Sequence, residues 1–317
     1  MTPTPDKGEA GTGLVTLTSY FKRTLNTMNT ADLAAFIEVA RFESFSLAAE
    51  KLHLTQPAVS KRVQNLEETL GVNLFDRVGR RVQLTESGRA LFPRARQWLL
   101  DFEDIKNSVT TLQGEVTGVL NIGTSHHIGL HRLPATLRAF SQTYPQVRLN
   151  IQFIDSEAAF DAVLSGDLEL GIVTLPPIAD NRLIAQKIWN DPLAFVAGKD
   201  HPLAQKTPLY LHDLTAHPAI LPSLNTFTRQ IAAELFKQAG LELNVTMTTN
   251  YLETIKMMVS IGLGWSVLPA NMANDEMVIL PLTGVTMQRH LGVVYHPRRT
   301  LSRAASAMLA ILHKANC

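Results

Sequence analysis

Apolar and polar positions in residues 45–75 follow the 3.6-residue period of two helices joined by a short turn. The first helix is predicted over Ser46–Leu52, with Ser46 as its N-cap. The second begins with Thr55 as N-cap and Pro57 in its first turn, and it ends at Gly71. Four apolar residues at helical spacing predict the core face of the second helix: Val59, Val63, Leu66 and Leu70.

The opposite face of the second helix is polar, and its side chains can donate and accept hydrogen bonds to base edges and phosphates. With the two residues at the helix start, the candidate DNA contacts are Thr55, Gln56, Pro57, Ser60, Lys61, Arg62 and Gln64. The periodicity alone is equally consistent with an ordinary helical hairpin that has a solvated face. The next segment, residues 74–85, is typical of a strand, a basic turn and a returning strand, a wing that would hold Arg77, Arg80 and Arg81 beside phosphates.

Length and charge agree with nucleic-acid binding at one end of the chain. The 317 residues, 45% of them hydrophobic, can form two or three domains. The formal net charge is only +1, yet nine cations and four anions lie between Lys51 and Arg96, a local excess of +5. We therefore expect double-stranded DNA to be a partner of the N-terminal part only.

Cysteine content and hydropathy exclude several protein classes. The single cysteine, Cys317, permits no disulfide within the chain and no cysteine metal site. No run of about 18 apolar residues is present, and residues 1–27 lack the apolar core of a secretory signal. We expect a cytoplasmic protein with no membrane partner, and a disordered extension over residues 1–27, which are rich in Thr, Gly and Pro.

The N-terminal motif closely resembles the DNA-binding region of LysR-type transcriptional regulators. The residues that carry the resemblance include Phe36, Ala40, Phe45, Ser46, Ala48, Ala49, Leu52, Thr55, Gln56, Pro57, Ala58, Val59, Ser60, Leu66, Glu67, Gly71, Phe75, Arg77, Leu84, Thr85 and Gly88. The resemblance implies a mixed fold: a mainly α winged helix-turn-helix over residues 28–86, a linker helix, and a two-lobed α/β effector-binding domain similar to periplasmic binding proteins.

The linker is expected over residues 87–113. Its apolar stripe consists of Leu91, Leu99, Phe102, Ile105, Val109 and Leu112. Such a stripe needs a partner, which in a single chain could be the following domain. The resemblance implies instead antiparallel pairing of two linkers in a homodimer, and a homotetramer is the habit of the family.

Residues 114–317 alternate predicted strands and helices. Strands are expected over 119–123, 147–154, 168–173, 193–197, 218–221, 245–248, 265–268 and 292–295, and helices over 130–144, 156–165, 229–239, 251–261 and 301–313. The first three strands form a βαβαβ unit, so they should be parallel. The family resemblance places lobe I over residues 117–189 and 291–317 and lobe II over residues 190–290.

Ligands of open α/β sheets bind beyond the carboxyl ends of the strands. Polar turns follow three predicted strands, and the third of them is 248–250. By resemblance, the effector-binding residues fall on the first two turns: Thr124, Ser125, His126 and His127 in one lobe, and Asn225, Thr226 and Phe227 in the other. Donors at helix N-termini favour an anion such as a carboxylate or a sulfate-like group, and no cofactor is implied. A charged His126 or His127 would make anion affinity fall as pH rises.

Two other interpretations of these turns are weaker. His127 and His131 would share a helix face and could bind a metal, but no carboxylate or thiol lies nearby in sequence, so we predict no metal site. Ser125 lacks the G-x-S-x-G context of a nucleophile, and Asp155 as its orienting acid is only a guess. The sequence offers no paired carboxylates and no nucleotide-binding glycine motif at the cleft turns. A ligand-responsive regulator is therefore favoured over an enzyme that carries a DNA-binding head.

Overall fold

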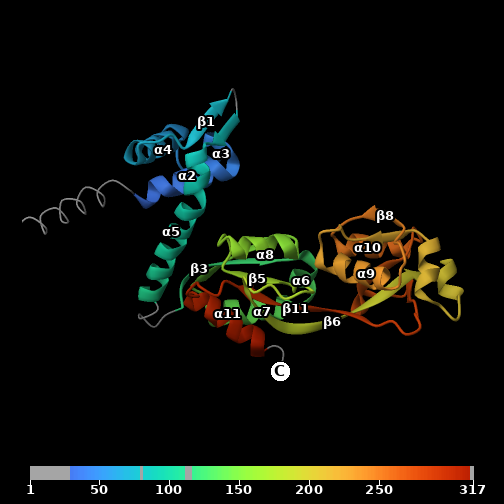
Figure 1. Ribbon diagram of the computed structural model, residues 1–317. Helices are drawn as coiled ribbons and strands as arrows, with labels where there is room; N and C mark the ends of the chain where they lie inside the picture. The colour runs from blue at the N-terminus through green and yellow to red at the C-terminus, as the bar shows by residue number, and fades with distance from the viewer. Residues whose placement is uncertain (1–28, 79–80, 111–115, 315–317) are drawn as a thin grey trace, which may run out of the picture. The chain divides into compact units, whose positions relative to one another are not determined.

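The computed structural model describes residues 29–78, 81–110 and 116–314, and the predicted extension at 1–27 lies outside them. The chain divides into two compact units between Lys106 and Asn107. The elements of the first unit are α2 (Thr30–Phe42), α3 (Phe45–Leu52), α4 (Gln56–Leu70), β1 (Phe75–Val78), β2 (Arg81–Leu84) and α5 (Glu86–Thr110), as Figure 1 shows.

Helices α2, α3 and α4 enclose one apolar core, and their ends are fixed by side-chain caps. Thr55 caps α4 by accepting a hydrogen bond from the Ala58 amide, as predicted. Gly71 ends α4 in the left-handed conformation at φ 68°, which glycine adopts without steric cost. Two expectations are wrong: the N-cap of α3 is Ser44 rather than Ser46, and Leu70 is exposed.

The wing and α5 complete this unit. Strands β1 and β2 pair antiparallel, and the Glu67 carboxylate on α4 accepts hydrogen bonds from the Leu74 and Phe75 amides, which fixes the start of the wing. Leu91 and Leu99 of α5 pack against the core of α2–α4. The predicted apolar stripe of the linker therefore has two environments. Leu91 and Leu99 pack on the core, whereas Phe102 and Ile105 are exposed. The sequence analysis missed Trp98, which is exposed and stacks on Phe102 with ring centroids 5.9 Å apart.

The second unit contains two lobes. Lobe I comprises β3 (Gly118–Thr124), α6 (His126–His131), α7 (Pro134–Thr143), β4 (Val147–Phe153), α8 (Ser156–Leu164), β5 (Leu170–Thr174) and α11 (Arg303–Lys314). Strand β3 pairs in parallel with β4 and β5, which confirms the predicted βαβαβ unit. Helices α7 and α11 cover one face of this sheet, and α8 covers the other (Figure 1).

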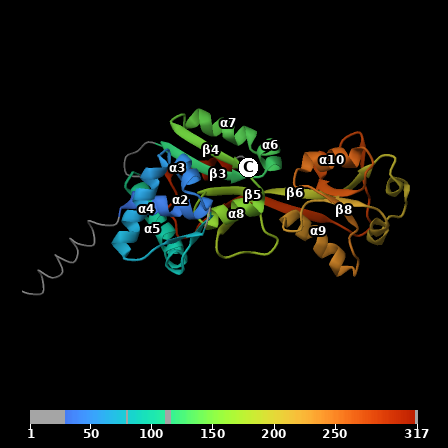
Figure 2. The same ribbon diagram turned by 90° about the horizontal axis from the view of Figure 1, so that it is seen from above.

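Two long antiparallel strands, β6 (Ile184–Gly198) and β11 (Met287–Tyr295), connect the lobes, as both ribbon views show (Figure 2). The strands predicted over 193–197 and 292–295 are only parts of them. In β6, alternate residues face two cores of lobe II. Phe195 and Ala197 lie in the core beside α9 (Phe227–Gln238), and Ala194 and Val196 lie in the core beside α10 (Leu252–Ser260). Strands β6 and β11 belong to a seven-stranded sheet with the order β10-β6-β11-β5-β3-β4, in which β10 is Met277–Ile279 and β9 (Ser266–Pro269) also pairs with β6.

Lobe II is built around the outer ends of these strands. Its elements are β7 (Ala219–Leu221), α9 (Phe227–Gln238), β8 (Val245–Thr248), α10 (Leu252–Ser260), β9 (Ser266–Pro269) and β10 (Met277–Ile279). In lobe I the helix predicted over 130–144 is wrong, because two helices form: α6 starts directly after its cap Ser125, and Pro134 begins α7. No helix in the described residues is both long and apolar enough to cross a membrane.

Candidate functional site

Most of the candidate DNA-binding residues of α4 are exposed. Gln56, Pro57, Lys61 and Gln64 are exposed, while Ser60 is half-buried. Arg62 is also half-buried, and its charge acts on the buried Asp32 carboxyl of α2, whose pKa is raised by burial and lowered by Arg62. Arg62 therefore supports the core as well as facing solvent.

The structure describes less of the three wing arginines than of the α4 residues. Arg80 lies outside the described residues, and for Arg77 and Arg81 the backbone of β1 and β2 is described but the side chains are not. These three residues stay predictions as phosphate contacts.

A small cavity of about 50 Å³ lies between the two lobes. Its walls include Ser125, His126, His127 and Thr226, so the structure brings together four of the seven predicted effector residues. Thr124 is buried at the end of β3, and its hydroxyl has no hydrogen-bond partner. Asn225 and Phe227 line an adjoining hollow of about 420 Å³ instead.

Two carboxylates line the cavity, and this pair was not foreseen in the sequence. Asp155 accepts a hydrogen bond from the Asn250 side-chain amide of lobe II at 2.6 Å. Glu157 crosses from lobe I to accept the hydrogen bond of the Phe227 amide in the first turn of α9. Burial raises the pKa of Glu157, although this amide hydrogen bond opposes the rise. A protein carboxylate thus occupies the helix N-terminus at which the sequence suggested an external anion.

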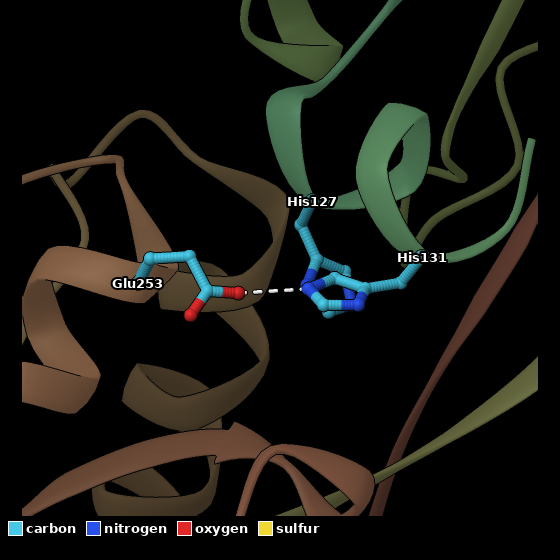
Figure 3. A group of neighbouring side chains, drawn as sticks. All are labelled: His127, His131 and Glu253. Atoms are coloured by element: carbon cyan, nitrogen blue, oxygen red, sulfur yellow. Dashed lines mark hydrogen bonds and ion pairs between the residues drawn. The ribbon is translucent and has the colours of Figure 1, made fainter. Parts of the chain in front are cut away.

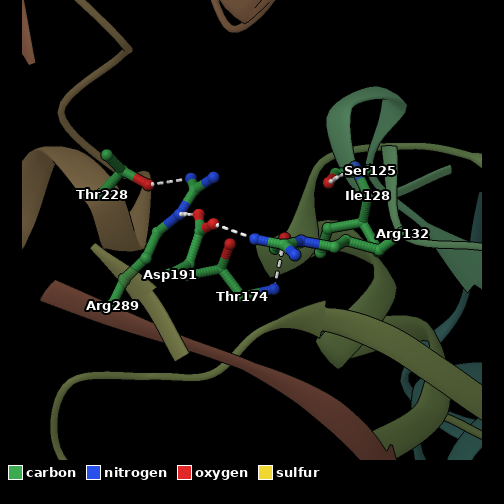
Figure 4. Close-up of polar contacts among 8 residues, drawn as sticks. Ser125, Ile128, Arg132, Thr174, Asp191, Thr228 and Arg289 are labelled. Carbon is green, nitrogen blue, oxygen red and sulfur yellow. Dashed lines mark hydrogen bonds and ion pairs between the residues drawn. The ribbon is translucent and has the colours of Figure 1, made fainter. Parts of the chain in front are cut away.

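A buried charge network forms another wall, and sequence reasoning missed it. Asp191 of β6 and Arg289 of β11 are register partners, joined from Arg289 Nε to Asp191 Oδ2 at 2.8 Å. Arg132 donates to the other Asp191 oxygen at 2.8 Å, and Arg289 Nη1 donates to the Thr228 hydroxyl at 2.8 Å (Figure 4). Burial lowers the pKa of Arg289 while Asp191 opposes this, and Arg289 Nη2 has no hydrogen-bond partner.

Both histidines of the first predicted turn have well-defined surroundings. His126 contacts Tyr251 of lobe II edge to face, with ring centroids 4.9 Å apart. His127 is buried, and neither of its ring nitrogens has a hydrogen-bond partner. Burial and the nearby charge of Arg289 lower the pKa of His127 to about 3. His127 is therefore neutral at neutral pH in this structure, so its ring gives no support to the expected pH dependence, which stays a prediction.

Comparison with known proteins identifies this architecture. Residues 113–316 match the LysR substrate binding domain, and residues 30–89 match the bacterial regulatory helix-turn-helix protein, lysR family. The chain belongs to the LysR family. This LysR regulator is 32% identical over 289 residues to the RuBisCO operon transcriptional regulator of Acidithiobacillus ferrooxidans, covering 90% of this chain and 93% of that protein.

Two further similarities extend over most of the chain. The HTH-type transcriptional activator CmpR of Synechocystis sp. is 29% identical over 282 residues, covering 87% of this chain and 92% of that protein. A full-length OxyR variant from Pseudomonas aeruginosa shares the fold, with a TM-score of 0.67 at 23% identity over 91% of this chain and 94% of that one. This LysR protein is a ligand-responsive, DNA-binding transcriptional regulator.

In this LysR regulator, the nucleophile hypothesis for Ser125 finds no support. The Ser125 hydroxyl caps α6 by accepting a hydrogen bond from the Ile128 amide at 3.5 Å, and no hydrogen bond joins it to His127.

The sequence carried only a weak signal for the Arg289–Asp191 pair, which the sequence analysis missed. Both residues are polar interruptions in segments whose hydrophobic pattern predicted strands only beyond them.

Proposed function

We propose that the cavity between the lobes binds a small anionic effector, such as a carboxylate or a sulfate-like group. The observation that carries this proposal is the set of wall groups without a protein partner. Arg289 Nη2 and both ring nitrogens of His127 are buried and unpartnered, and a neutral imidazole offers one N–H. Two buried donors that converge on one cavity favour a ligand rich in acceptor atoms.

The acidic groups of the cavity are already committed within the chain. Asp155 accepts from Asn250, and Glu157 accepts from the Phe227 amide. An anion would approach Arg289 beside the Glu157 carboxylate, so that Glu157 opposes binding as long as it is ionised. With about 50 Å³ available, the cavity admits only a small head group in this arrangement of the lobes.

We propose that effector binding acts on the relative arrangement of the DNA-binding heads. Contacts that join the lobes in and around the cavity include Asp155 to Asn250, Glu157 to Phe227, His131 to Glu253, and His126 to Tyr251. A ligand between the lobes binds this closed arrangement better than an open one, and only that difference in affinity can drive a switch.

For the remaining parts we propose the roles expected from the sequence. Residues 28–86 bind double-stranded DNA through α4 and the wing, residues 87–113 pair with a second chain, and residues 114–317 bind the effector. Trp98 and Phe102, exposed and stacked on α5, support pairing of two linkers. The relatives named above are transcriptional regulators, and a regulator of bacterial genes acts in the cytoplasm, where the DNA is.

We propose binding without turnover as the role of the cavity. The alternative is an enzyme that carries a DNA-binding head. In that case the Asp155 and Glu157 carboxylates in the cavity would act as an acid and base pair. Incubation of the purified protein with each bound anion, followed by mass spectrometry, distinguishes the two, because turnover yields a product and binding returns the anion unchanged.

Calorimetry of the full-length protein against sulfate, phosphate and small carboxylates tests the anion site. Arg289→Lys keeps the charge beside Asp191 but loses donors, so anion affinity should fall about tenfold or more. Glu157→Gln removes the opposing charge and should raise affinity, a gain that misfolding cannot produce. Thr143→Ala, at an exposed hydroxyl near the end of α7, is the control. Binding that ignores Arg289 and Glu157 would place the effector elsewhere.

A further inference from the structure

Two histidines and a glutamate meet at the edge of the cleft. His127 and His131 lie one turn apart on α6, with ring centroids separated by 4.8 Å. Glu253, in the first turn of α10, belongs to the other lobe, and its Oε1 lies 2.7 Å from His131 Nε2. Figure 3 shows both rings projecting from α6 toward the Glu253 carboxylate. The sequence argued against a metal here because no carboxylate is near the histidines along the chain, but folding supplies one.

We propose that His127, His131 and Glu253 bind a divalent transition metal ion across the cleft, with Zn²⁺ as the best fit. One ligand atom from each residue lies within 4.8 Å of the other two. Two imidazoles and one carboxylate form a donor set that suits zinc and neighbouring metals of the first transition row. Mg²⁺ and Ca²⁺ fit less well, because both prefer oxygen ligands.

His127 has the ligand atoms that a metal requires. A metal binds an imidazole through an unprotonated ring nitrogen. The residue is only 6% exposed, and both of its ring nitrogens are without a hydrogen-bond partner. Buried polar atoms normally have partners, so this unpartnered ring, directed toward His131 and Glu253, independently indicates a ligand at this point.

The three residues reach metal-binding geometry through small side-chain movements. Zinc bonds of about 2.0–2.2 Å in a tetrahedral arrangement place ligand atoms about 3.3 Å apart. The His131–Glu253 pair at 2.7 Å would widen, and the longest separation of 4.8 Å would shorten. The side chains of His131 and Glu253 are 36% and 49% exposed, so both can rotate. Three protein ligands leave the fourth position to water or a small anion.

A metal at this point favours the same closed arrangement as an anion in the cavity, but through different ligand atoms. Two of its ligands come from α6 in lobe I and one from α10 in lobe II, so the complete site exists only when the lobes are close. Metal binding would therefore stabilise the closed arrangement. The site stands on the positions of three side chains and does not depend on an anionic effector.

Cobalt titration of the full-length chain, purified without a histidine tag, tests the proposal. Co²⁺ replaces Zn²⁺ in such sites, and its visible absorption is strong only at low coordination number. We expect a saturable band that Zn²⁺ displaces. His131→Ala and Glu253→Gln each remove one metal ligand. Each should weaken Co²⁺ binding about tenfold or more, because the loss of a group that only orients a ligand already has an effect of this size.

Two controls make the result specific. His212→Ala removes an exposed histidine that also lies beside a carboxylate, Asp213 at 3.2 Å, and this variant should bind Co²⁺ like the wild type. Thr143→Ala, the control variant of the anion titrations, should do the same. A weak band alone, or binding unchanged by both His131→Ala and Glu253→Gln, would overturn the proposal. Zn²⁺ should also raise the melting temperature of the wild type and not that of Glu253→Gln.

Discussion

At the residue scale, Glu157 determines how the cleft responds to acid. Its folded-state pKa lies above the ordinary value of 4.5, so the ionised group costs stability above its folded pKa, and this cost disappears as pH falls below 4.5. Glu157→Gln can still accept the Phe227 hydrogen bond without the charge. Denaturant unfolding should therefore show the variant more stable than the wild type at neutral pH, with a difference that vanishes toward pH 4.5. A constant difference would exclude the charge as the cause.

Base recognition is also decided by single residues. Gln56 is exposed at the start of α4, so Gln56→Ala should change which half-site bases matter, at a cost of about 1–3 kcal/mol at the affected position. Arg80→Ala, in the turn predicted from the sequence, should weaken binding to all DNA sequences alike and reduce the salt dependence. Binding assays with a set of mutated operators at two salt concentrations check both. The opposite pattern would reverse the roles of helix and wing.

The sequence was informative about residues whose role is local. Thr55 and Gly71 could be assigned from their chemistry because a cap acts within one helical turn. The charge network around Arg289 could not, since Asp191 is 98 residues away along the chain. Glu253 is 122 residues from His131, so the same limit hid the candidate metal site.

At the scale of elements, the connection between the lobes depends on close packing of β6 and β11. The register of the two strands shifts between Leu291 and Gly292, and a Cβ built on Gly292 would lie 2.2 Å from the Gln186 carbonyl oxygen. Gly292→Ala should therefore destabilise the fold by about 1–3 kcal/mol, because backbone must move. Chemical denaturation measures this, with Gln288→Ala, at an exposed position of β11, as the control. Equal stability of the two variants would show that the bulge adapts.

Element types were easier to predict than element lengths. The parallel unit β3, β4 and β5 follows from predicted strands that alternate with helices along the chain, and the structure confirms it. Strand β6 begins at Ile184, well before the predicted start at Leu193. The prediction missed the first half of the strand because its polar residues do not fit a hydrophobic strand pattern. Those residues are tolerated since a neighbouring strand and the Arg289 side chain satisfy them.

At the scale of the whole molecule, we predict association through α5. Burying Trp98 and Phe102 in a dimer removes two large side chains from water, each contributing about 1.5–3 kcal/mol. Phe102→Glu should weaken the dimer more than tenfold in sedimentation experiments. Leu263→Glu, which alters an equally exposed side chain in lobe II, is the matched control, since both residues are 45% exposed. A stable wild-type monomer at micromolar concentration would contradict this assembly.

The paired strands β6 and β11 have a consequence for how such regulators diversify. Asn190 and His290 are register partners, so the chain leaves lobe I and returns to it at neighbouring points of one sheet. Lobe II is thus an insertion with adjacent ends, and adjacent ends are what allow one segment to replace another without strain on the host. The lobe II side of the effector cavity can therefore be replaced as one segment, without any change to the DNA-binding residues.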